Sequence, residues 1–133
     1  MERKLIDFRK EDIMIKFYGY SKCSTVKKAK KWLQDNNIEF AEIDLINDTP
    51  TKDELEQIYK KSGMPIKKFF NTSGIKYREL GLKDIVKTET DDKLLEILAS
   101  DGMLIKRPMI VGEDIVINGF KEKEYEEKLL NNK

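Results

Sequence analysis

The chain has 133 residues, of which 26 are basic and 25 are acidic, and its formal net charge is +1 at pH 7. Histidine is absent and Cys23 is the single cysteine, which excludes an intrachain disulfide, a Cys- or His-based zinc site, a Ser-His-Asp triad and a Cys-His nucleophile. This length predicts one domain with its own core, and the near-zero charge argues against direct binding of nucleic acid or a membrane.

The sequence predicts neither a membrane span nor an N-terminal signal peptide. No apolar run approaches the roughly 20 residues that span a bilayer, and the first residues lack the apolar stretch of a signal peptide. A lone thiol without an export signal fits the reducing cytoplasm, which is the expected location. Residues 1–13 are polar and mixed in charge and predict an N-terminal arm, with the folded domain at residues 14–133.

The first structural unit is predicted to be strand, helix, strand. Residues 13–20 are apolar and rich in β-forming side chains, and residues 39–45 alternate in polarity, so both are expected to be strands. Ser24 and Thr25 are candidate caps for the helix between them. That helix is indicated by apolar residues at i, i+3 and i+7 and by two asparagines as its stop: Val26, Ala29, Leu33, Asn36 and Asn37. A helical connection predicts parallel strands.

Helical signals dominate the middle of the chain and predict a helical insert over about residues 50–102. Thr51 and Glu54 form a capping box ahead of a helix that ends at Gly63. The composition of residues 71–74 predicts a loop, and residues 76–82 are expected to form one or two helical turns. Thr90 marks the start of a further helix, with Gly102 as its stop.

The last unit is predicted to be a hairpin followed by a helix. Residues 108–111 and 115–117 flank a polar turn, and residues 121–130 form an amphipathic pattern with Tyr125 and Leu129 facing inward. The whole order is therefore strand-helix-strand, helices, then strand-strand-helix, which predicts one α/β domain. The aromatic residues Trp32, Phe69 and Phe70 are assigned to its core.

The net charge conceals strong segregation along the chain. Residues 13–34 carry six lysines and no acid, residues 58–78 carry six bases and no acid, and residues 103–112 add Lys106 and Arg107. Residues 35–57, between the first two basic blocks, have a net charge of −7. Either the lysines are solvated helix faces, which is the usual case, or the basic blocks converge on one anion site.

Cys23 lies in the turn between the first predicted strand and the helix that follows it. Backbone N–H groups at a helix N-terminus favour negative charge, and Lys22, Lys27 and Lys28 are close in sequence, so a reactive thiolate beside an oxyanion site is expected. The alternative is a buried, inert cysteine, which is the commoner fate of a free thiol. Val26 stands where a Cys-x-x-Cys motif would have its second cysteine, so any disulfide of Cys23 must be with another molecule.

Several motifs, in the same order across about residues 14–130, resemble the arsenate reductase (ArsC)/Spx family. They are FYGYSKCSTVKKAKKWL at 17–33, KFFNTSG at 68–74, YREL at 77–80 and LIKRPMIV at 104–111. The chain is most similar to uncharacterised arsenate-reductase-like proteins of low-GC Gram-positive bacteria. The resemblance implies an α/β thioredoxin-like fold, with a mixed four-stranded sheet and a helical insertion, and a cis peptide bond before Pro108.

The resemblance also implies a chemistry. In the reductase branch a cysteine thiolate, matched here by Cys23, attacks arsenate, and glutathione with glutaredoxin completes the reduction. The protein is then expected to hold no bound cofactor and to use glutathione or another small thiol as co-substrate, with glutaredoxin or another thiol reductant as partner. Our first hypothesis is therefore an arsenate-reductase-like oxidoreductase whose one cysteine acts on an oxyanion or forms a mixed disulfide.

The anion site is expected to depart from the reductase pattern. Of three family arginines that hold the oxyanion, one is matched by Arg107, the second falls near Asn71 and the third falls within residues 118–120. Lysine neutralises an oxyanion but does not bind it bidentately. The predicted anion-binding set is Arg107 and Asn71 together with Ser24, Thr25 and Lys27.

The Spx branch of the family offers a second hypothesis of a different class. Those proteins bind the C-terminal domain of the RNA polymerase α subunit, and many carry a Cys-x-x-Cys redox switch near the position of Cys23. Val26 removes that switch, which leaves a polymerase-binding regulator without disulfide sensing. A third, weaker hypothesis is a glutathione-type thiol transferase with no arsenate role.

Overall fold

The computed structural model describes residues 15–130, so the predicted N-terminal arm lies outside the described residues. The first unit is β1 (Ile15–Gly19), α2 (Ser24–Asp35) and β2 (Phe40–Asp44). β1 and β2 are parallel, with Ile15 opposite Phe40, as predicted from their helical connection. α2 buries the predicted apolar face and ends at Asn36, followed by Asn37 in the left-handed region with φ 57°.

The C-terminal unit completes the sheet. β3 (Met109–Val111) and β4 (Val116–Asn118) form the predicted antiparallel hairpin, and β3 is antiparallel to β1. The strand order β2-β1-β3-β4 makes a mixed four-stranded sheet, which confirms the predicted α/β thioredoxin-like fold. The last helix starts as α7 (Glu122–Tyr125) and continues as the π-helical turn η3 (Glu126–Leu130), with Tyr125 and Leu129 buried as expected.

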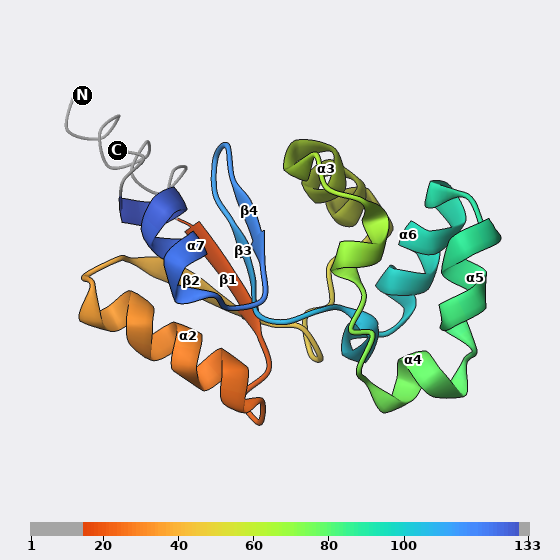
Figure 1. The fold of residues 1–133 in the computed structure, drawn as a ribbon, viewed down its shortest axis with the longest axis horizontal. Helices are drawn as coiled ribbons and strands as arrows, with labels where there is room; N and C mark the ends of the chain where they lie inside the picture. Colours follow the sequence, from red (N-terminus) through yellow and green to blue (C-terminus); the bar gives the residue numbers. More distant parts are fainter. Residues whose placement is uncertain (1–14, 131–133) are drawn as a thin grey trace.

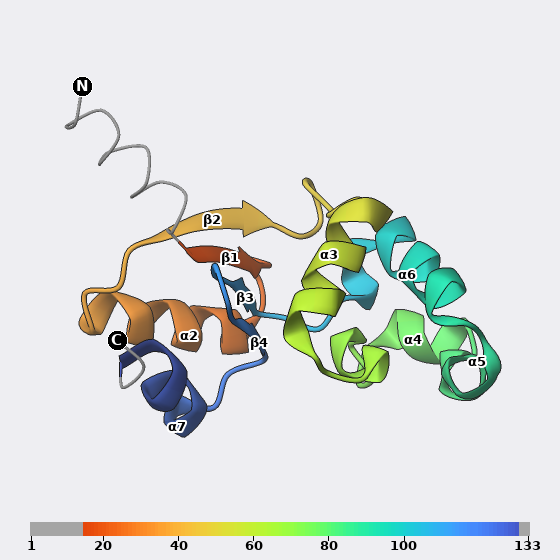
Figure 2. The same ribbon diagram turned by 90° about the horizontal axis from the view of Figure 1, so that it is seen from above.

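Between β2 and β3 the chain forms the helical insert, which occupies the right-hand half of the molecule in Figures 1 and 2. Its elements are α3 (Lys52–Ser62), η1 (Ile66–Phe69), α4 (Ile75–Glu79), α5 (Leu82–Thr88), α6 (Asp91–Ser100) and η2 (Gly102–Leu104). The capping box at Thr51 and Glu54 is present, and Gly63 ends α3 in the left-handed conformation with φ 66°. Thr90 caps α6 by accepting a hydrogen bond from the Lys93 N–H. None of the helices within residues 15–130 is long and apolar enough to cross a membrane.

The helices differ from the sequence predictions in two respects. α5 was not predicted because its N-cap is Gly81, which offers no side-chain cap, and because it contains β-branched residues. Ser24 and Thr25 are not caps, since the N-cap of α2 is Cys23 and no side chain caps that helix. α6 ends at Ser100 with Asp101 as its C-cap, so Gly102 directly follows the helix end as predicted. A Cβ at Gly102 would overlap the carbonyl group of Leu45, so the position requires glycine for close approach.

Each face of the sheet carries its own hydrophobic cluster. On one face α2 and α7 cover the strands (Figure 2), and buried Phe17, Ile110 and Ile117 contact their apolar residues. The other face contributes Tyr18 and Met109 to a cluster shared with the helical insert. The three aromatic residues assigned to the core are buried, with 9% of Trp32, 2% of Phe69 and 1% of Phe70 exposed. Throughout, "sheet half" denotes β1 to β4 with α2, α7 and η3.

Candidate functional site

Cys23 is placed at the N-terminus of α2, a helix of 12 residues. Its backbone is extended, with φ −89° and ψ 123°, and its N–H donates to the Tyr20 carbonyl at 2.9 Å. The Cys23 carbonyl accepts the first helical hydrogen bond from the Lys27 N–H at 3.2 Å. The side chain is a free thiol of intermediate exposure. The N–H groups of a first helical turn have no helical acceptors, so this thiol lies where the helix favours negative charge.

A cleft of about 510 Å³ opens beside Cys23. Its walls come from the start of α2, from the insert around η1 and the following loop, and from the segments that flank β3 and β4: Cys23, Thr25, Met64, Lys68, Asn71, Ser73, Lys106, Arg107, Asn118, Gly119, Phe120, Lys121 and Glu124. Four of these side chains are cationic. The Glu124 carboxylate accepts from Lys128 at 3.1 Å, which offsets its charge, so the cleft favours an anion.

Arg107 is fixed against the backbone of the insert. Its Nη1 donates to the carbonyl oxygens of Met103 at 3.2 Å and Ile105 at 3.3 Å, and its guanidinium carbon lies 5.4 Å from the centre of the Tyr20 ring. Its Nε is buried without a hydrogen-bond partner. The Arg107–Pro108 peptide bond is cis, as the family resemblance implies. A rigid guanidinium with an unused donor suits the binding of an oxyanion.

Asn71 lies near the place where the resemblance puts the second arginine, and Asn118 belongs to the 118–120 stretch where it puts the third. Asn71 Nδ2 donates to the Met103 carbonyl at 3.5 Å, the same oxygen that Arg107 uses, and its N–H donates to Leu104 at 2.8 Å. Asn118 Nδ2 donates to the Lys68 carbonyl at 3.2 Å, while its Oδ1 is buried without a partner. The two amides therefore hold the backbone of the cleft walls by hydrogen bonds, and neither adds a positive charge to the cleft.

The wall after β4 is held by Tyr125. Its hydroxyl donates to the Gly119 carbonyl at 2.8 Å, and its ring packs edge-on against Phe120 at 4.8 Å between centroids. Burial, with a smaller contribution from Glu124, raises the pKa of Tyr125 well above its ordinary value of 10.0. The hydroxyl therefore stays protonated as a donor, which keeps Gly119 and Phe120 in position at the cleft.

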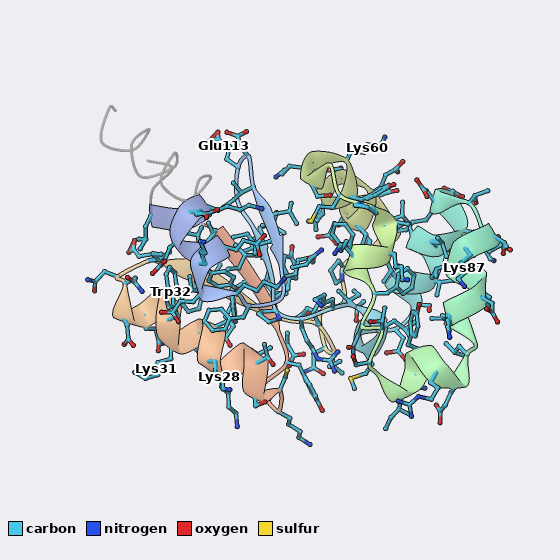
Figure 3. All side chains as sticks on the ribbon, in the orientation of Figure 1. Lys28, Lys31, Trp32, Lys60, Lys87 and Glu113 are labelled. Atoms are coloured by element: carbon cyan, nitrogen blue, oxygen red, sulfur yellow. The ribbon has the colours of Figure 1, made fainter. Side chains whose placement is uncertain are left out.

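Of the predicted site residues, Cys23, Thr25, Asn71 and Arg107 meet in this cleft, whereas Ser24 and Lys27 are exposed and do not line it. Successive residues of a helix are about 100° apart, so Thr25 and Lys27 lie about 200° apart around α2 and face different directions. The outer face of α2 also carries Lys28 and Lys31, which point away from the sheet (Figure 3).

The basic blocks of the sequence converge only in part. The first block contributes Cys23 and Thr25 to the cleft but no lysine, whereas the second and third contribute Lys68, Lys106 and Arg107. Lys121 was not predicted, because it lies in a segment with more acids than bases. Within residues 15–130 no three acidic or cysteine side chains are grouped to hold a metal ion.

Comparison with known proteins gives a consistent family. The family model described as "ArsC family" matches residues 18–128. The uncharacterized protein YusI of Bacillus subtilis is 53% identical over 111 residues, which cover 84% of this chain and 94% of YusI. The solution structure of SACOL0876 from Staphylococcus aureus is 49% identical with a TM-score of 0.82, covering 88% of this chain and 99% of that one. The regulatory protein MgsR of B. subtilis is 31% identical over 104 residues, covering 78% and 81%.

Proposed function

The chain belongs to the ArsC family, and we propose that it is a thiol-dependent oxidoreductase of the arsenate reductase type. Cys23 is the nucleophile, and the cationic side chains of the cleft bind the anionic substrate. One observation carries this proposal: a free, partly exposed thiol at a helix N-terminus opens on a cleft lined by Lys68, Lys106, Arg107 and Lys121.

The proposed reaction has two thiol steps. The Cys23 sulfur attacks arsenic(V) and forms a sulfur–arsenic bond as one oxygen leaves as water. A small thiol then attacks the Cys23 sulfur, the sulfur–arsenic bonding pair stays on arsenic, and arsenite leaves a mixed disulfide on Cys23. A second thiol, or glutaredoxin, attacks that disulfide and restores the Cys23 thiol. This sequence needs an external reductant because the chain has one cysteine, and it requires a reducing compartment such as the cytoplasm.

Binding of the oxyanion would rest on a mixed set of donors. Arg107 supplies a planar guanidinium and the start of α2 supplies backbone N–H groups and the Thr25 hydroxyl. The lysines add point charges without bidentate geometry, so they neutralise an anion with less selectivity for its shape than arginines would. The proposed enzyme should therefore bind several tetrahedral oxyanions with similar affinity.

The test is an arsenate reduction assay with purified protein, glutathione and glutaredoxin, with arsenite as the measured product. Turnover that requires the small thiol is expected, and Cys23→Ser should abolish it. Ser21→Ala, an exposed change two residues earlier, is the matched control and should retain full turnover. Equal turnover by the Cys23→Ser variant would refute the mechanism.

A regulator that binds the RNA polymerase α subunit is the second candidate, favoured by the similarity to the regulatory protein MgsR. Val26 is buried, with 2% of its surface exposed, and it packs beside Gly19. The position that would hold the second cysteine of a Cys-x-x-Cys pair therefore belongs to the hydrophobic core. Such a regulator would act without a disulfide switch. A pull-down with the polymerase α C-terminal domain at low salt decides the question, because an absence of binding there argues against this role.

A further inference from the structure

A second hollow lies beside the cleft at Cys23, on the insert side, and shares two lining residues with it. This hollow has a volume of about 370 Å³ and is lined by Pro65, Lys67, Lys68, Phe70, Thr72 and Lys106. Lys68 and Lys106 line both spaces, so they stand on the boundary between them. A single tetrahedral oxyanion occupies a small part of this combined volume, which leaves room for a larger molecule beside the reacting sulfur.

The backbones of the two shared lysines are anchored. The Lys106 N–H donates to the Phe69 carbonyl at 2.8 Å, and the Lys68 carbonyl accepts from Asn118 Nδ2 at 3.2 Å. A β-bridge between Phe70 and Ile105 ties the two segments together. The two lysines are thus presented to the same space by a fixed frame, although they are 38 positions apart in the chain.

Lys106 also lies against the 118–120 stretch, where the resemblance puts the third arginine. A Cβ at Gly119 would lie 3.0 Å from Lys106 Cε and 3.9 Å from its Nζ, so the ammonium group lies over Gly119. Gly119 has φ 83°, a conformation that favours glycine, and its lack of a side chain leaves this space to Lys106. Residues 118–120 carry no basic side chain, and Lys106, from the segment between η2 and β3, places a positive charge beside them.

Building on the proposed function, we propose that the thiol co-substrate of Cys23 is polyanionic. Its sulfur reacts in the cleft while its phosphate or carboxylate groups bind Lys67, Lys68 and Lys106 over the second hollow. The reaction is an exchange in which the Cys23 thiolate attacks one sulfur of a disulfide, the sulfur–sulfur bond breaks, and the displaced thiolate takes up a proton. The reverse exchange releases Cys23 during turnover.

The experiment measures the rate at which Cys23 forms a mixed disulfide, by intact-protein mass. The probes are coenzyme A disulfide, which carries phosphates, glutathione disulfide, which carries carboxylates, and the uncharged hydroxyethyl disulfide, each in low and in high salt. Both anionic probes should react faster than the uncharged one, by roughly fivefold for each lysine engaged, and high salt should reduce this advantage. The faster of the two anionic probes identifies phosphate or carboxylate as the preferred group.

Variants separate specific binding from general charge. Lys68→Gln and Lys106→Gln should slow the anionic probes by a larger factor than they slow the uncharged probe. Lys87→Gln removes an equal charge from α5 at the far side of the insert (Figure 3), and it should leave all three rates unchanged. Equal rates for all three probes would overturn this inference alone, whereas a Cys23 that reacts with none of them would overturn the proposed function as well.

Discussion

Different kinds of interaction stabilise the sheet half and the helical insert: long-range strand pairing in the first and local helix caps in the second. In the sheet half, β1 pairs with β2 and with β3, although β3 follows the whole insert in sequence. The insert is built from short helices with local caps, such as the reciprocal pair of Thr51 and Glu54. The nucleophile comes from the sheet half, while Lys68 and Asn71 come from the insert. The site therefore depends on the contact between a region fixed by long-range pairing and a region fixed by local signals.

The largest expected effect is at the junction of the two regions. Gly102→Ala should destabilise the protein by about 4 kcal/mol, because the new methyl group would overlap the Leu45 carbonyl and the backbone there must move. Urea unfolding followed by far-UV circular dichroism measures the change. Gly63→Ala is the control, since its Cβ would meet nothing within 4 Å and only the left-handed backbone resists it. An equal loss in both variants would show that the close contact at Gly102 is unimportant.

A pair of core substitutions tests whether the two regions unfold together. Leu33→Ala in the sheet half and Leu98→Ala in the insert each remove a fully buried side chain, and each should cost about 3 kcal/mol. Because both clusters include one face of the same sheet, a single unfolding transition is expected. The fluorescence of Trp32, the one tryptophan, reports the sheet half, and circular dichroism reports the whole chain. Separate midpoints for the two signals in Leu98→Ala would show that the insert unfolds alone.

The third prediction concerns the polar contact that fixes the cleft wall in the sheet half. Tyr125→Phe removes the hydroxyl that donates to Gly119 and leaves a buried carbonyl without this donor, so a loss of about 1.5 kcal/mol is expected. Tyr59→Phe, which removes an exposed hydrogen bond to Asp91 within the insert, should cost less. The free energy of unfolding of both variants at neutral pH provides the comparison, and equal losses would contradict it.

The same tyrosine gives the stability a pH dependence. Burial raises the folded-state pKa of Tyr125 above the unfolded value of about 10. The contribution of this hydroxyl is therefore fully present below about pH 10, and it is lost as the pH rises toward the folded-state pKa. The difference in unfolding free energy between the wild type and Tyr125→Phe should shrink above pH 10, and a constant difference would argue against the burial effect.

The smallest expected loss of stability comes from removing a helix cap in the insert. Thr51→Ala removes the side chain that accepts from the Glu54 N–H at 3.1 Å, and it should cost about 1 kcal/mol. Thr51→Ser keeps the hydroxyl oxygen and should restore most of that loss, as measured by urea unfolding. If serine proved as damaging as alanine, the methyl group of Thr51 would matter and the cap would not.

The sequence by itself determined the elements whose signals lie within a few residues. The capping box at Thr51, the left-handed stop at Gly63 and the apolar face of α2 were predicted because their causes are local hydrogen bonds and helical periodicity. The position of Cys23 at a helix N-terminus followed from the same reasoning. α5 was missed because its start at Gly81 has no capping side chain.

Only the tertiary structure decided which charges surround Cys23. Lys106 lies 83 positions after Cys23 and reaches the cleft because β3 pairs with β1, a long-range contact that no local pattern encodes. Lys27, four positions from Cys23, is excluded because the burial of Val26 fixes the rotation of α2 and turns Lys27 away from the cleft. Proximity in sequence thus identified the thiol, whereas the pairing of the sheet and the orientation of α2 selected its neighbours.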